Sequence, residues 1–381
     1  MKLNKTMGRV ATTLVATAML ASVAVVPAFA TDGEGDQKTP PPSGLQDGTF
    51  EIAKNLKVGE KVFTPKVSFH FNIQPENPTV TDDVTEVRNG VTVEAGQVGD
   101  IVWDNDASFN AGTAAMTQDT VVKADQNAAY HVDLSKFTLR GPGVYKYKVT
   151  EDTSNPYNGI TYDNSIKYLY VTIIQGDSGL EVASTELVNN DAEHTKTNDF
   201  NNDYDADTET LHDVTIHKFV EGQFGDKFND SFTFNVKVEG EEEETYYVEY
   251  VEGGNETTMK TDSLQTGVEK NFTVRNGGYV KIYGLDSDDK YTVTETDYAD
   301  KGYVAYTDTD YNAGDTHETN GSTKGDKIDK ATISADTDVA IYNVKTSTPA
   351  TGIVMDIAPY ALLVVVAAAG CFVFMRKRRE D

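Results

Sequence analysis

The stretch Tyr147-Lys148-Val149-Thr150-Glu151 returns later in the chain as Tyr291-Thr292-Val293-Thr294-Glu295. In both copies bulky apolar residues alternate with polar ones, which is the pattern of a half-buried β-strand. Two further segments repeat in the same order. Residues 67–71 correspond to residues 230–234, and residues 200–204 and 341–345 form a last strand that carries an asparagine. The sequence therefore predicts an all-β chain with two tandem copies of one β-sandwich.

Turn residues and one polar junction set the expected domain boundaries. Short alternating runs are broken by Asn-Gly, Gly-Pro-Gly and Asp-Ser-Gly, which favour turns, and no long amphipathic helix is found. The acidic stretch 203–210 separates the halves, so we expect sandwiches over residues 49–205 and 210–346. Residues 31–48 are rich in Gly, Asp and Pro and are predicted to be an extended linker.

Charge and cysteine content restrict the functional classes. The 381 residues include 33 Lys plus Arg against 61 Asp plus Glu, giving a net charge of -28. Such a chain repels phosphate, so nucleic acid is not an expected partner. The single cysteine is Cys371, and everything before it must be stabilised without disulfides.

The two ends predict an exported protein. Residues 1–30 have basic residues, an apolar run and then Ala28-Phe29-Ala30, as in a signal peptide cleaved after Ala30. Near the other end, an apolar segment at 358–375 precedes the basic residues 376–379, which indicate the cytoplasmic side. The membrane is expected as a partner only through this segment.

The residues that come just before the apolar segment are Thr348, Pro349, Ala350, Thr351 and Gly352. Motif, apolar segment and basic tail over 348–381 resemble a Gram-positive cell-wall sorting signal. The resemblance implies that a sortase cuts between Thr351 and Gly352 and passes the Thr351 carbonyl to an amine. Thr348 stands where the family usually has Leu.

Each half carries polar residues on the apolar face of its strands. Residues two apart in a strand share a face. On this alternation each half buries one Lys, one Glu and one Asn: Lys54, Glu151 and Asn202 in the first half, and Lys218, Glu295 and Asn343 in the second. The alternative is that they are ordinary, partly exposed strand residues.

A buried Lys, Glu and Asn together can form a covalent bond. Burial favours the neutral forms, so the lysine becomes a nucleophilic amine and the glutamate keeps a proton for a hydrogen bond. Attack of the amine on the Asn carboxamide would release ammonia and leave a Lys–Asn isopeptide bond. The folded core supplies the proximity, so no external enzyme is required.

This arrangement resembles the pilin isopeptide-linkage domains of Gram-positive pili, relatives of the immunoglobulin-like collagen-adhesin B-type domains. In that family the Lys is on the first strand, the Glu in a Tyr-x-Val-Thr-Glu-like strand, and the Asn on the last strand. The resemblance assigns the catalytic role to Glu151 and Glu295 and the cross-links to Lys54–Asn202 and Lys218–Asn343. The second half departs more, because Ile341 and Tyr342 stand where Phe-x-Asn is typical.

Two functions remain open at this point. The first is a pilus shaft subunit on the surface of a Gram-positive bacterium, whose partners are a sortase, other pilin subunits and peptidoglycan. The second is a solitary wall-anchored adhesin with a host surface ligand. Lys196 is the candidate acceptor of the next subunit, although it shares parity with Asn202 and could face inward. Nothing indicates an enzyme acting on external substrates.

No cofactor or metal is expected from the sequence. Asp308-x-Asp310-x-Asn312 begins like a calcium loop, but Ala313 and Thr319 stand where Gly and a bidentate Glu are needed. Residues 241–244, four glutamates in a row, are interpreted as a surface loop.

Overall fold

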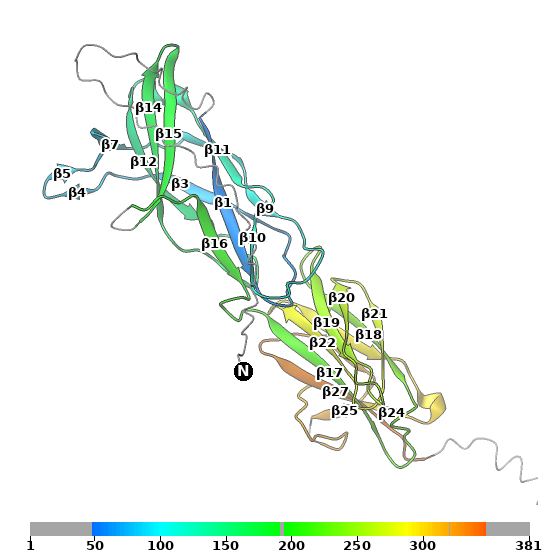
Figure 1. The fold of residues 1–381 in the computed structure, drawn as a ribbon. Coiled ribbons are helices and arrows are strands. Elements are labelled where there is room, and N and C mark those ends of the chain that lie inside the picture. The colour runs from blue at the N-terminus through cyan, green and yellow to red at the C-terminus, as the bar shows by residue number, and fades with distance from the viewer. Residues whose placement is uncertain (1–47, 191–193, 320, 348–381) are drawn as a thin grey trace, which may run out of the picture.

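A computed structural model describes residues 48–190, 194–319 and 321–347. Two β-sandwiches follow each other along the chain and lie end to end (Figure 1). The first, here called the first sandwich, contains strands β1 to β16, and the second sandwich contains β17 to β27. The only helices among the described residues are two short 3-10 turns, η1 (Leu134–Phe137) and η2 (Ala299–Lys301). The prediction of an all-β chain with two sandwiches is confirmed.

The first sandwich has two six-stranded sheets. One has the order β13 (Ile160–Thr161), β16 (Asp199–Tyr204), β1 (Thr49–Val58), β11 (Ala128–Val132) and β8 (Ile101–Asn105), with β10 (Thr120–Lys123) also on β1. The other has the order β15 (Gly179–Asn189), β14 (Lys167–Gly176), β12 (Gly143–Glu151), β7 (Val91–Ala95) and β6 (Val87–Arg88), with β3 (Phe71–Pro75) also on β12. Two small ribbons pair β2 (Val67–Phe69) with β9 (Ala107–Phe109) and β4 (Val80–Thr81) with β5 (Val84–Thr85).

The second sandwich has a seven-stranded and a four-stranded sheet. The larger has the order β20 (Lys260–Gln265), β19 (Thr245–Val251), β22 (Tyr279–Leu285), β17 (His212–Glu221), β27 (Thr337–Val344), β24 (Val304–Asp308) and β25 (Ser322–Lys324). The smaller has the order β21 (Lys270–Val274), β18 (Phe232–Glu239), β23 (Lys290–Glu295) and β26 (Lys327–Ala331).

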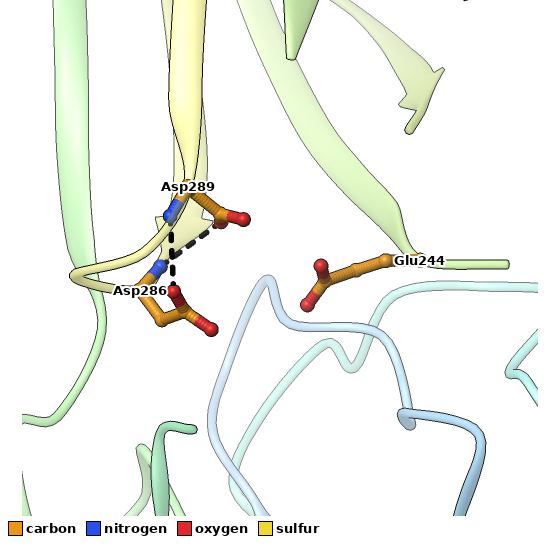
Figure 2. Close-up of side chains that lie close together, drawn as sticks. All are labelled: Glu244, Asp286 and Asp289. Atoms are coloured by element: carbon orange, nitrogen blue, oxygen red, sulfur yellow. Dashed lines mark hydrogen bonds between the residues drawn. The ribbon is translucent and has the colours of Figure 1, made fainter. Parts of the chain in front are cut away.

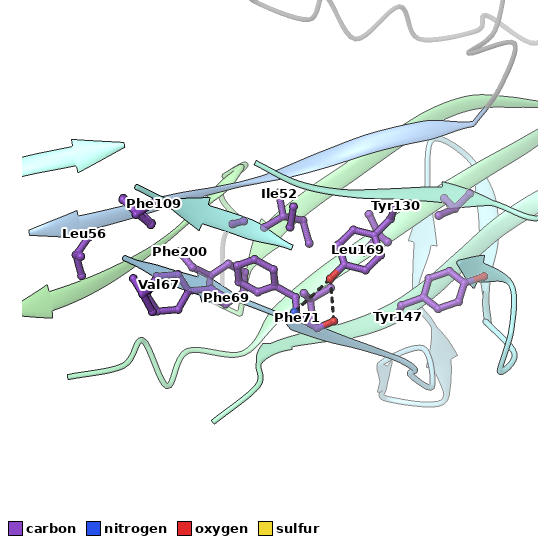
Figure 3. Packing of buried hydrophobic residues seen from close by; sticks show 14 of the residues in the cluster. Ile52, Leu56, Val67, Phe69, Phe71, Phe109, Tyr130, Tyr147, Leu169 and Phe200 are labelled. Carbon is purple, nitrogen blue, oxygen red and sulfur yellow. Dashed lines mark hydrogen bonds between the residues drawn. The ribbon is translucent and has the colours of Figure 1, made fainter. Parts of the chain in front are cut away.

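Apolar side chains from both sheets fill each sandwich. In the first, Leu56 and Phe200 of one sheet meet Phe71, Tyr147 and Leu169 of the other (Figure 3). In the second, the core is built mostly from valine and isoleucine, with aromatic residues such as Phe234 and Tyr291. Alternation of such residues along the strands leaves one face of each sheet for the core.

In both sandwiches the first and last strands lie side by side and run parallel. β1 pairs with β16 so that Leu56 lies opposite Asn202, and β17 pairs with β27 so that Val220 lies opposite Asn343. The two halves that repeat in the sequence therefore pair their first and last strands in the same register. The first strand of each sandwich therefore lies next to its last strand. Residues that are far apart in the sequence can then be joined by a short link.

Polar contacts connect the two sandwiches. Lys61 Nζ lies 3.1 Å from Glu249 Oε1 and donates to the Tyr283 hydroxyl at 3.1 Å. Asn158 donates to Asp288 at 2.8 Å. The junction between the sandwiches is therefore a specific interface.

Several expected segments lie outside the described residues. These are the signal peptide with Ala30, nearly all of the linker at 31–48, and the sorting signal with Thr348, Pro349, Ala350, Thr351 and Gly352. Within the described ranges there is no helix of the length and apolarity that crossing a membrane requires.

Candidate functional site

Three side chains that are far apart in the sequence meet in the core of the first sandwich. Lys54 comes from β1 and Asn202 from the neighbouring β16, while Glu151 is the last residue of β12 in the facing sheet. Their exposed fractions are 0%, 2% and 7%. The strand alternation noted in the sequence places each of them among apolar neighbours, so water does not compete for their contacts.

Glu151 contacts both of the other residues. Lys54 Nζ donates to Glu151 Oε2 at 2.9 Å, and Asn202 Nδ2 donates to Glu151 Oε1 at 2.9 Å. The carboxyl group therefore lies between the amine and the amide nitrogen. A group in this position can move a proton from one nitrogen to the other.

Burial shifts both titratable groups toward their neutral forms. It lowers the pKa of Lys54 to about 8, although the charge of Glu151 acts in the opposite direction. Burial likewise raises the pKa of Glu151, against the effect of Lys54. The neutral amine, which is the nucleophilic form, is thus far more accessible here than in a lysine exposed to water.

Other groups complete the first site. The backbone amide of Asp163 donates to Asn202 Oδ1 at 2.8 Å, and the Lys54 ammonium lies 4.8 Å from the centre of the Phe69 ring. A second buried lysine, Lys167, donates to the Asp199 carbonyl and lies 4.2 Å from the centre of the Phe200 ring. Its charge adds to the lowering of the Lys54 pKa.

The second sandwich contains an equivalent site. Lys218 of β17, Asn343 of β27 and Glu295 at the end of β23 have exposed fractions of 0%, 1% and 2%. Lys218 Nζ lies 3.0 Å from Glu295 Oε1 and donates to Asn343 Oδ1 at 2.5 Å. Burial lowers the pKa of Lys218 to about 8 and raises that of Glu295.

The two sites match in their surroundings as well. Phe232 lies under Lys218, 4.3 Å from Nζ to the ring centre, as Phe69 lies under Lys54. Phe71 is the cross-strand partner of Glu151, and Phe234 is the cross-strand partner of Glu295. The sequence correspondence between residues 67–71 and 230–234 thus marks equivalent positions around two equivalent sites.

One contact differs between the sites. In the first, the asparagine oxygen is held by a backbone amide and the asparagine nitrogen by the glutamate. In the second site, the lysine nitrogen itself donates a hydrogen bond to the asparagine oxygen. The first arrangement has a hydrogen-bond donor in place for charge that develops on the carbonyl oxygen, as in an oxyanion hole.

Lys196 is not part of either site. It lies just before β16 with 64% of its side chain exposed and pairs with Glu186 at 2.7 Å. The inward orientation that its parity with Asn202 left open is therefore not found. An exposed amine is accessible to a large enzyme-bound acyl group.

The interpretation of residues 241–244 as a surface loop is wrong for its last residue. Glu244 is 7% exposed and faces the junction between the sandwiches, while the three glutamates before it are exposed. Four identical residues carry no periodicity, so nothing in the sequence indicates that one of them turns inward.

Two participants were missed from sequence. Lys167 shares its alternation with Leu169, Val171 and Ile173, a signal that could have identified it as buried. Asp163 contributes only its backbone amide, which lies in a loop. The type of residue at this position therefore does not indicate the contact.

Comparisons with known proteins agree with this architecture. A family model described as a Spy0128-like isopeptide containing domain matches residues 50–205, and a domain of unknown function (DUF7601) matches residues 212–345. A curated protein named pilin, from Streptococcus pyogenes serotype M1, is 25% identical over 338 residues, which cover 86% of this chain and 90% of that protein.

Solved structures share the fold. A glutamate-to-alanine mutant of the major pilin from Streptococcus pyogenes gives a TM-score of 0.56 at 20% identity, covering 79% of this chain and all 100% of that one. Another major pilin protein from Streptococcus pyogenes gives 0.53 at 18% identity, covering 79% of this chain and 98% of that one. The chain is thus similar to Gram-positive pilins: residues 50–205 match the isopeptide-containing domain, the curated relative is a pilin, and the solved major pilins share its fold.

Proposed function

We propose that the protein is a pilus shaft subunit whose two sandwiches are each stapled by a self-formed Lys–Asn isopeptide bond. The observation that carries the proposal is the position of Glu151, which hydrogen-bonds to both the Lys54 amine and the Asn202 amide. The staples would be Lys54–Asn202 and Lys218–Asn343, with Glu151 and Glu295 as the catalytic groups. Each reaction occurs once per bond and is maturation of the subunit, not turnover.

The proposed reaction follows from these contacts. The neutral Lys54 amine attacks Cγ of Asn202, and the negative charge that develops on Oδ1 is stabilised by the Asp163 amide. Glu151 gives its proton to Nδ2 and takes one from Nζ, so it ends in the form in which it began. The C–N bond to Nδ2 breaks, ammonia leaves, and Nζ stays bonded to Cγ. No oxidant, metal or cofactor takes part.

The streptococcal relatives support the choice of residues. Their structures include a glutamate-to-alanine mutant and an asparagine-to-alanine mutant of the major pilin, at positions 51 residues apart. Glu151 and Asn202 are separated by the same 51 residues. Two residue types at one spacing, in a protein of the same fold, favour equivalent roles.

The pH dependence of bond formation is a direct consequence of the shared proton. The reacting form, with a neutral Lys54 and a protonated Glu151, contains one proton, as does the Lys⁺–Glu⁻ pair. The pKa of Lys54 is lowered to about 8, so the pair loses that proton above about pH 8. The rate of bond formation is therefore expected to fall about tenfold per pH unit above this pH, and to fall again in acid, where Glu151, whose pKa is raised, adds a second proton to the pair.

The measurement starts from unlinked chains recovered unfolded from inclusion bodies. They are diluted into buffers between about pH 5 and about pH 10, quenched at intervals and weighed by mass spectrometry. Refolding is followed separately by tyrosine fluorescence, so that slow folding is not mistaken for slow chemistry. A rate that rises to about pH 8 and then stays level through pH 10 would contradict the role of Glu151 as a proton donor, because the rate would then follow the neutral amine alone.

The parallel pairing of first and last strands gives the staples a mechanical role. Tension applied to the two ends of a sandwich pulls directly on β1 and β16, or on β17 and β27. An isopeptide bond between these strands carries the load through covalent bonds instead of a hydrogen-bond ladder. It also restricts the local opening that proteases require.

Assembly into a pilus needs an acceptor amine, and we propose Lys196 for this role. A sortase would cleave after Thr351 and join its carbonyl to Lys196 of the next subunit, and the last subunit would be joined to peptidoglycan. Lys196 is suited to the reaction because it is exposed and its ion pair with Glu186 is a surface contact.

Changing Lys196 is expected to abolish the polymer. Wall extracts of the native Gram-positive strain should show a ladder of detergent-resistant multimers, and Lys196→Ala should leave only single wall-linked subunits. The matched control is Lys123→Ala, an exposed lysine of β10. A ladder that persists in Lys196→Ala assigns the acceptor elsewhere, and a single species from the unchanged protein would favour the solitary adhesin.

A further inference from the structure

Three buried carboxylates meet at the junction between the sandwiches. Glu244 lies directly before β19, and Asp286 and Asp289 lie in the turn between β22 and β23. Their exposed fractions are 7%, 2% and 1%. One oxygen of each lies within 4.8 Å of one oxygen of the other two (Figure 2). Three oxygens at this spacing surround a volume of the size of a single ion.

No cationic side chain compensates this cluster. Within the described ranges, no Lys, Arg or His forms an ion pair with Glu244, Asp286 or Asp289; the lysines of the junction pair with other acids, Lys61 with Glu249 and Lys66 with Glu243. All three carboxyl groups are buried. Holding them together without a cation is therefore unfavourable.

One oxygen of the cluster has no partner. Asp286 Oδ1 accepts from the amides of Asp288 at 2.7 Å and Asp289 at 3.1 Å. Asp286 Oδ2 is buried and accepts no hydrogen bond from any described group. It points toward Glu244 across the space between the carboxylates (Figure 2). A buried carboxylate oxygen without a partner calls for an explanation, and a bound cation would supply one.

The surrounding residues hold the cluster in place. The Tyr246 hydroxyl lies 2.7 Å from Glu244 Oε2 and 3.0 Å from Asp289 Oδ1, so it contacts two of the three carboxylates. The backbone also approaches closely at Gly240. A Cβ there would lie 2.2 Å from Asp289 Oδ1 and 2.6 Å from Glu244 Oε2, distances that no side chain tolerates. The neighbouring residues therefore hold the three carboxylates in defined positions.

We propose that Glu244, Asp286 and Asp289 bind a calcium ion at the junction between the two sandwiches. Carboxylate oxygens are the ligands of hard cations, and the absence of His and Cys from the set disfavours zinc and copper. Calcium fits better than magnesium because it accepts several carboxylate oxygens in irregular geometry, whereas magnesium retains much of its water.

Such an ion would connect the junction to the first sandwich. Glu244 Oε1 accepts a hydrogen bond of 3.4 Å from the hydroxyl of Tyr204, the last residue of β16. Asn202, on the same strand, belongs to the first isopeptide site. Calcium would thus order Glu244 for contact with the strand that carries the first staple, and it would link the two sandwiches at their junction. The site does not depend on whether the isopeptide bonds form.

The test uses terbium(III), a luminescent substitute for calcium, with the protein released from the wall of the native strain. Tyr246 lies against the proposed ligands and would sensitise bound terbium when tyrosine is excited. Luminescence should appear on adding terbium to metal-free protein at neutral pH and disappear when calcium is added in excess. Calcium, but not magnesium at the same concentration, should also raise the Tm of the protein.

Asp286→Asn keeps the shape of the side chain and should weaken calcium binding by about 10- to 100-fold, since affinity depends on the number of charged ligands. Glu244→Gln is the second variant, in case the first does not fold. Glu242→Gln, an exposed change in the same run of glutamates as Glu244, should bind as the unchanged protein does. The proposal is overturned if luminescence survives both ligand changes, if Asp310→Asn alone removes it, or if the unchanged protein binds no ion because the carboxyl groups hold protons instead.

Discussion

The Glu151→Ala variant is expected to lower the Tm of the first sandwich by about 10–20 °C and to leave the second sandwich unchanged. The reason is the lost cross-link. A covalent link that closes a loop of more than about 100 residues stabilises a domain by about 5 kcal/mol, mainly by restricting the unfolded chain. For a domain of this size each kcal/mol corresponds to about 2–4 °C. Glu295→Ala should act on the second sandwich in the same way.

Calorimetry of the two variants measures this, and two further variants separate the bond from the loss of a buried side chain. Asn202→Ala removes the electrophile but leaves the contact between Lys54 and Glu151, so it should cost a similar shift in Tm. Glu94→Ala changes an exposed glutamate of β7 and should have little effect. A first sandwich that melts at the same temperature with and without Glu151 would exclude a stabilising bond there.

The fold was largely readable from the sequence because both signals behind it are local. Strand alternation and turn residues predicted an all-β chain, and the repeated Tyr-x-Val-Thr-Glu stretch predicted that the two halves are alike. The same alternation placed Lys54 and Lys218 on the inward face, where the structure has them with no exposed surface. A residue's side of a strand follows from counting alone.

The remaining parts of the sites depend on groups that sequence patterns do not identify. The donor to Asn202 Oδ1 is a backbone amide, which every residue except proline has, so nothing distinguishes Asp163 in the sequence. Glu244 lies in a run of four glutamates, and its contacts come from both sandwiches, with Tyr246 in its own and with Tyr204 in the first. Contacts that arise where two domains meet leave no periodic signal in either of them.

The two sites also show that similar sequence does not imply identical geometry. Lys218 contacts the asparagine oxygen directly, whereas at the first site Glu151 contacts the asparagine nitrogen. Both arrangements bring a lysine amine, a carboxyl group and a carboxamide together in a dry core, which is what the reaction requires. We therefore expect a bond in each sandwich, despite the departure of the second from the typical Phe-x-Asn pattern.

The largest expected effect is all-or-none, because a glutamate change should abolish its own bond completely. The mass of the folded chain from Thr31 to Thr351 should fall short of its sequence mass by two ammonia molecules. Glu151→Ala and Glu295→Ala should each restore one ammonia mass, the double variant should restore both, and Glu94→Ala should restore none. Peptide mapping of the unchanged protein should then find Lys54 joined to Asn202 and Lys218 joined to Asn343.

This intact-mass measurement tests the central claim most directly, because it reads the proposed chemistry with no assumption about stability or assembly. A deficit of two ammonia masses that disappears stepwise with the two glutamates is the result that we predict. A mass equal to that of the plain sequence, from protein shown to be folded, would contradict the account and leave two unlinked sandwiches with buried Lys–Glu pairs.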